Sequence, residues 1–155
     1  MDAATADRLH EVLSRLHAEH EQLRDVLIRQ QHALRRFDAG ALEQLRSRGD
    51  ALAERIAELE ASRARLVGDG RRAMDLAQEA PEPQRSRLIA ICLGLKRIAE
   101  EIASLGRINH AAARHMLDHF HSAYRMLAEA NRPAAYGASG EKLVGDGALL
   151  IDAVA

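Results

Sequence analysis

Residues 9–37 read LHEVLSRLHAEHEQLRDVLIRQQHALRRF. Apolar side chains recur in this segment at alternating intervals of four and three residues, which is the heptad pattern of a helix that packs along a neighbouring helix. The segment therefore predicts a long amphipathic helix, capped by Asp2 or Thr5 and ended by the sequence FDAG. The repeat positions, of which only two are polar, are Leu9, Leu13, Leu16, His20, Leu23, Leu27, Gln30, Leu34 and Phe37.

A second series with the same spacing follows at once, from Leu42 to Leu66, and GDG at residues 68–70 ends it. Because so short a connection returns the chain on itself, we expect these two helices to form an antiparallel hairpin over residues 5–67. Residues 71–80 read RRAMDLAQEA and could form a short helix before the next prolines.

The third series runs from Leu88 to Leu127, after Pro81 and Pro83, and its helix is expected to end near Ala130. Two consecutive intervals of four residues around Asn109 shift the phase of the repeat, which is typical of a stutter in a coiled coil. The fold class predicted is all-α, with three long helices in an antiparallel coiled-coil-like bundle.

Beyond this bundle, assigned to residues 1–131, the apolar period stops. Residues 132–155 are rich in glycine and alanine and are expected to form a flexible C-terminal tail. One of only four aromatic residues in the chain, Tyr136, stands in this tail, within the sequence YGASG that ends at Gly140. A tyrosine between a proline and two glycines suggests an anchor for a partner, or a side chain that folds back to cap the bundle.

Charge and composition exclude several classes of protein. The 155 residues carry a formal net charge of −1 with 29% charged residues, so the basic excess of a nucleic-acid-binding protein is missing. No apolar run approaches the roughly 20 residues that span a bilayer, and the first residues lack the pattern of a secretory signal. A single cysteine, Cys92, suits a reducing compartment. We expect a cytoplasmic protein.

Eight histidines raise the question of a metal site. His115, Asp118, His119 and His121 fall close together in HMLDHFH, and spacings of three or four residues can place two ligands on one helix face. The inward-facing Glu-x-x-His pairs of di-iron bundles are replaced by aspartate versions that lie off the apolar series. A solvated helix face explains the cluster better, so no metal and no cofactor are predicted. No nucleophile and base can be placed together, and the chain is not expected to be an enzyme.

A broad apolar stripe occupies the end of the third helix, with Met116, Phe120, Tyr124, Met126 and Leu127. Two readings stay open. The stripe could be core, as methionine and aromatic residues at helical spacing usually are. It could also be a groove for an amphipathic helix of a partner, because the second helix is shorter than the other two and leaves part of the third without a neighbour.

The chain resembles the FlgN-like flagellar export chaperones over about residues 9–140. The resemblance rests on EHEQLRDVLIRQQHAL in the first helix, LAERIAELEASRARLV in the second, the asparagine Asn109 in LGRINHAAARHML, and the terminal YGASG. It implies a non-enzymatic, cytoplasmic type III export chaperone for hook–filament junction proteins, which binds the amphipathic terminal helix of its client and delivers it to the export gate. The alternative is a coiled-coil adaptor or self-associating structural protein.

The resemblance also implies two functional regions. A monomer or weak homo-oligomer would bind the client through the C-terminal half of the third helix, and the tail would dock at the flagellar export gate. The client-binding positions implied are Asn109, Ala113, Met116, Phe120, Tyr124 and Leu127, and the gate-docking positions implied are Tyr136, Gly137 and Gly140.

Overall fold

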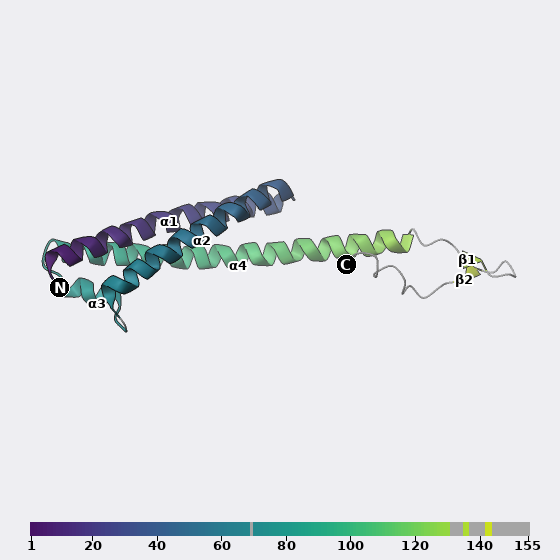
Figure 1. The fold of residues 1–155 in the computed structure, drawn as a ribbon. Coiled ribbons are helices and arrows are strands. Elements are labelled where there is room, and N and C mark those ends of the chain that lie inside the picture. Colours follow the sequence, from purple (N-terminus) through teal and green to yellow (C-terminus); the bar gives the residue numbers. More distant parts are fainter. Residues whose placement is uncertain (69, 131–134, 137–141, 144–155) are drawn as a thin grey trace. The chain divides into compact units, whose positions relative to one another are not determined.

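The computed structural model describes residues 1–68, 70–130, 135–136 and 142–143. Within them the predicted all-α fold with three long helices is confirmed, and the short helix after the hairpin is present (Figure 1). The flexible tail was predicted for residues 132–155, and of these only residues 135–136 and 142–143 are described. The elements are α1 (Ala3–Arg35), α2 (Ala39–Val67), α3 (Ala73–Gln78), α4 (Gln84–Ala130), β1 (Ala135–Tyr136) and β2 (Lys142–Leu143).

The chain divides into two compact units, Met1–Met116 and Leu117–Ala155. The boundary falls inside α4, which is nonetheless one continuous helix through Gly106 and Asn109. The first unit contains α1, α2, α3 and the larger part of α4, whereas the second contains the end of α4 and the two strands. Each unit is considered by itself below.

The two ends of α1 are fixed by hydrogen bonds of the expected kind. Asp2 caps the start, where its Oδ1 accepts from the amide of Thr5 at 2.8 Å. At the other end Phe37 has a φ of 55°, and the amide of Asp38 donates to the carbonyl of Ala33, which is the pattern of a Schellman turn. Asp38 then caps α2 by accepting from the amide of Ala41 at 2.9 Å. The hairpin therefore turns within residues 36–38.

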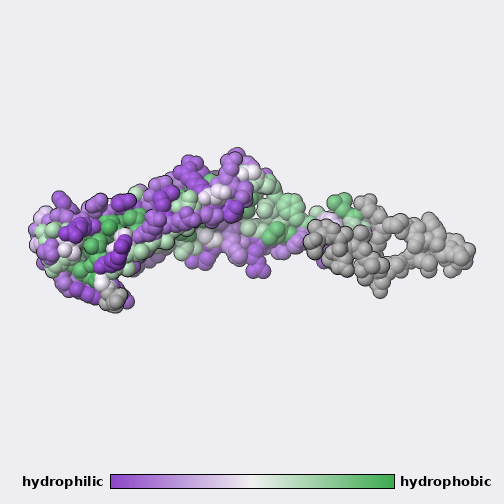
Figure 2. Space-filling model, in the orientation of Figure 1, coloured by the Kyte–Doolittle hydropathy of each residue, from purple (hydrophilic) through white to green (hydrophobic). Residues whose placement is uncertain are grey.

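The core of the first unit lies near the N-terminal end of α1, where α2 returns and α3 leads into α4. Figure 2 shows apolar residues gathered between the helices at this end, with polar residues around them. Leu76 and Ala77 of α3 are buried, so this short helix closes the end of the bundle. The buried cluster consists of Ala6, Leu9, Leu13, Leu16, Val67, Leu76, Ala77, Ala80 and Leu88.

Helix α4 runs parallel to α1 within the first unit. A Cβ added at Gly94 would lie 3.2 Å from Nε2 of His17, so the two helices approach closely there. Farther along, Arg24 of α1 is 3.6 Å from Glu101 of α4. Because residue numbers increase together along both helices, α1 and α4 point the same way and α2 is antiparallel to both.

The second unit contains a pairing that the periodicity did not predict. Ala135 and Tyr136 of β1 pair antiparallel with Lys142 and Leu143 of β2, with Ala135 opposite Leu143. The two strands bring the ends of the segment that contains YGASG side by side. Two-residue strands are too short to leave an alternating pattern in the sequence.

Candidate functional site

The apolar face of α4 changes from buried to exposed along the helix. Leu88 is 0% exposed and Ile98 is 3% exposed. Ala113 and Met116, two of the positions implied by the resemblance, are half-buried in the first unit. From Leu117 to Ala130 every residue is exposed. The seam that builds the bundle therefore continues in the sequence after its burial ends.

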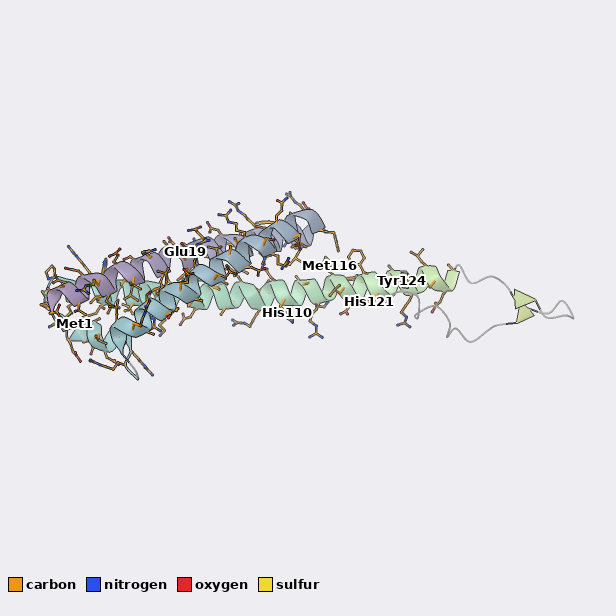
Figure 3. All side chains as sticks on the ribbon, viewed as in Figure 1. Met1, Glu19, His110, Met116, His121 and Tyr124 are labelled. Atoms are coloured by element: carbon orange, nitrogen blue, oxygen red, sulfur yellow. The ribbon has the colours of Figure 1, made fainter. Side chains whose placement is uncertain are left out.

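Within the second unit, large apolar side chains form an exposed stripe on the end of α4. Leu117, Phe120, Tyr124 and Leu127 succeed one another at intervals of three, four and three residues, so they lie on one helical face. Tyr124 is 70% exposed and Leu127 is 62% exposed, and Met126 is exposed beside them. Figure 3 labels Tyr124 on this part of the helix. We call this set, with Met126, the α4 stripe.

Leu117 is the member of the stripe that the sequence prediction left out. The heptad series was followed through Met116, and the residue after it was not included. The interval between Leu117 and Phe120 was nevertheless readable in the sequence, because three residues bring two side chains to the same face.

Asn109 is buried, with 7% of its surface exposed, between α4 and α1 of the first unit. Its Nδ2 donates a hydrogen bond of 2.7 Å to the main-chain carbonyl of Leu27, whereas its Oδ1 is buried and has no partner among the described residues. A polar side chain in an apolar seam fixes the register of the helices at a cost in stability. The geometry thus gives Asn109 a contact inside the bundle.

The gate-docking positions implied by the resemblance are only partly described. The backbone of Tyr136 belongs to β1, and Gly137 and Gly140 lie outside the described residues. The α4 stripe and the tail positions are all in the second unit, whereas Asn109, Ala113 and Met116 are in the first.

The histidines do not form a metal centre in the described part of the chain, where no group of three or more possible ligands is positioned around one point. His20 instead places Nδ1 at 2.7 Å from the carbonyl of Leu16, one turn earlier in α1. His17 lies 3.9 Å from Glu21. These contacts are local to the helix surface.

Cys92 is half-buried against the core of the first unit. Burial raises the pKa of its thiol, and the nearby Arg63 opposes this effect to a smaller extent. Because the thiolate is the reactive form of cysteine, the buried position disfavours nucleophilic chemistry.

None of the described helices is both long enough and apolar enough to cross a membrane.

An all-helical bundle in which one helix exposes a stripe of large apolar side chains has the architecture of a helical protein-binding module. A comparison with known families identifies which one. The sequence matches the FlgN protein family over residues 1–143, and the chain belongs to this family. It is therefore a flagellar export chaperone, a class of proteins that bind flagellar proteins and are not known as enzymes.

The other two comparisons give no relative from which details could be transferred. No curated protein matches the sequence, and no solved structure matches the fold.

Proposed function

We propose that this chaperone binds hook–filament junction proteins in the cytoplasm and delivers them to the flagellar export gate. The client contributes an amphipathic terminal helix, and the α4 stripe receives the apolar face of that helix. The single observation that carries the proposal is the exposure of the stripe, where four large apolar residues lie on one face with more than half of each side chain accessible.

The chemistry of the stripe suits a helix as its ligand. Side chains at intervals of three and four residues form a ridge that packs into a groove between side chains of a second helix. The flexible side chain of Met126 and the aliphatic side chain of Leu127 can adapt to different apolar partners. Tyr124 adds a broad, rigid surface. Binding would remove this apolar surface from water and would cover the client's own apolar face.

The same spacing also suits self-association, which is the competing function. A second copy of the chain could cover the α4 stripe with its own and form a coiled-coil dimer. The two functions differ in the free protein, because a client-binding stripe stays open in a monomer and a dimerisation stripe is covered as the concentration rises.

For the tail, we propose that Tyr136, Gly137 and Gly140 dock at the export gate. Support comes from the position of Tyr136 within the motif YGASG, outside the heptad series that builds the bundle. An aromatic side chain is a common anchor of protein interfaces, and neighbouring glycines allow the backbone to fit a receptor.

Size-exclusion chromatography with light scattering tests the client proposal. The full chain is run alone and with a C-terminal segment of a hook–filament junction protein from the same organism. The test variant is Tyr124→Ser with Leu127→Ser, and the matched control is Leu93→Ser, which removes an apolar side chain of similar exposure from the same helix in the first unit. We expect a low-order complex that the control retains and the test variant loses.

A free protein that dimerises with increasing concentration and forms no complex would overturn the client proposal in favour of self-association. Equal loss of the complex in both variants would show that the α4 stripe is not the binding surface.

For the tail, Tyr136→Ala should keep the client complex and the melting temperature but weaken binding to the purified cytoplasmic part of the export gate. A fall in melting temperature as large as that of a core variant would contradict the docking role.

A further inference from the structure

A basic cavity lies at the turn of the α1–α2 hairpin. Its volume is about 430 Å³. The floor is apolar, because Ala33 is buried and Ala41 and Leu45 are half-buried. The rim is polar and exposed, and it consists of Arg29, His32, Arg36, Asp38, Gln44 and Arg48. Both helices contribute, so the cavity is a feature of the hairpin as a folded unit.

The rim carries an excess of positive charge, with three arginines against one carboxylate. The side chains of Arg29, Arg36 and Arg48 take part in no hydrogen bond or ion pair with any other described residue. The one carboxylate on the rim, Asp38, already accepts a hydrogen bond from the amide of Ala41 as the cap of α2. Neighbouring Arg46 behaves differently, since it pairs with Glu43 at 2.7 Å and Asp50 at 3.0 Å.

The grouping of these three arginines around one cavity points to a ligand. Other surface arginines, such as Arg8 and Arg107, also have no carboxylate partner among the described residues, but Arg29, Arg36 and Arg48 surround a single cavity. Like charges held close together repel one another, and an anion placed among them relieves the repulsion. The Schellman turn at Phe37 and the cap at Asp38 hold the backbone of the rim in a defined position. The first turn of α2 adds the positive end of a helix dipole.

We propose that this cavity is a second docking site, which receives an acidic segment of a protein partner. Guanidinium groups bind carboxylates through paired hydrogen bonds, so glutamates or aspartates of the partner would lie on Arg29, Arg36 and Arg48. An apolar side chain between them would rest on the floor formed by Ala33, Ala41 and Leu45. The open, exposed rim favours side chains presented by a protein over a small molecule, because small-molecule sites enclose most of the ligand.

The test uses the full chain and a fluorescently labelled peptide of about twelve residues, in which glutamates flank single leucines; in the control peptide every glutamate is glutamine. The test variant is Arg36→Gln with Arg48→Gln. Its matched control, Arg46→Gln with Arg97→Gln, removes the same charge from two exposed arginines outside the cavity. Fluorescence anisotropy measures binding at low ionic strength, and circular dichroism verifies that both variants stay folded.

We expect the acidic peptide to bind saturably, the test variant to bind it about tenfold more weakly, and the control variant to differ by no more than about twofold. Absence of saturable binding would overturn the proposal, as would equal losses in the two variants or equal binding of the glutamine peptide. Displacement of the peptide by inorganic phosphate at a total ionic strength held constant with chloride would overturn it in favour of a small anion. None of these outcomes depends on the α4 stripe or on the client assigned to it.

Discussion

Two stretches of α4 carry the same apolar spacing and have opposite environments. In the first unit, Leu88 and Ile98 of the helix are buried in the bundle. In the second unit, Leu117, Tyr124 and Leu127 repeat the interval on an exposed face. A heptad repeat therefore predicts a helix and the face that it uses for packing. Whether that face is already covered depends on the neighbouring elements, and here the two halves of one helix differ.

The largest expected effect comes from making the same substitution in both halves. Leu88→Ala should lower the free energy of unfolding by about 3 kcal/mol, because it leaves a cavity in the packed core. Leu127→Ala should change it by less than about 0.5 kcal/mol, because the side chain is already exposed to water. Urea denaturation followed by circular dichroism measures both. Similar losses in the two variants would break the contrast between the halves.

A second prediction concerns Asn109, which is buried between α4 and α1. Asn109→Asp should destabilise the bundle by about 2 kcal/mol at neutral pH, because it replaces the amide that donates to Leu27 with a buried, unpaired carboxylate. Burial raises the pKa of such a carboxyl, so the loss should shrink as the pH falls and the group is protonated. Asn109→Leu, which removes the unpaired Oδ1 as well, is the control and should cost much less. A pH-independent defect in the aspartate variant would contradict this explanation.

A smaller effect is expected for an ion pair that joins α1 and α2 outside the basic cavity. Arg55 places Nε at 3.1 Å from Oε2 of Glu19, and both side chains are partly exposed. Arg55→Gln should therefore cost about 0.5 kcal/mol at low salt, and the cost should disappear in about 1 M sodium chloride because the ions are screened. Unfolding in urea at the two salt concentrations measures it. A loss as large as that of Leu88→Ala would mean that charge contributes as much as burial to the first unit.

The smallest effect is expected at the start of α1. Hydrogen bonds from the amide and the hydroxyl of Thr5 lower the pKa of the exposed Asp2 below its usual 3.8. The cap therefore stabilises the helix above that pH, and its contribution is lost as the pH falls through the lowered pKa of the folded state. Asp2→Ala should lower the melting temperature slightly at pH 7 and not at pH 2. Asp2→Asn, which caps without titrating, should show little dependence on pH.

Much of the fold followed from the sequence, because helix periodicity and capping are local properties. The hairpin and the end of α4 at Ala130 were predicted and are confirmed. Of the two caps that the sequence offered, Asp2 is the one that forms, and the short helix that the sequence allowed after the hairpin is present. The turn of the hairpin was placed less accurately. Gly40 was expected to belong to the break, yet it lies in the first turn of α2, and the left-handed residue is Phe37. A non-glycine residue with positive φ is uncommon, so the sequence offered no warning of it.

The site was less predictable than the fold, because burial depends on which helices meet. The sequence left open whether the end of the third helix was core or groove, and its exposure in the structure favours the groove. Asn109 was grouped with the client-binding residues, although its amide contacts Leu27, which is 82 residues away in the chain. The basic cavity was not predicted, because in the sequence Arg29, Arg36 and Arg48 have the spacing of ordinary surface charges. Only the folded hairpin places them around one cavity.

The continuity of α4 across its buried and exposed halves has a consequence for the entropy of binding. Short isolated helices are unstable in water because the first turn is costly to form, whereas each further residue adds to an existing helix at little cost. The packed residues of α4 supply that first turn, so the residues after Leu117 propagate a helix that has already been nucleated. A partner helix that docks on the α4 stripe then has to order only itself, and less of the interaction energy is lost to ordering than when two disordered segments fold together.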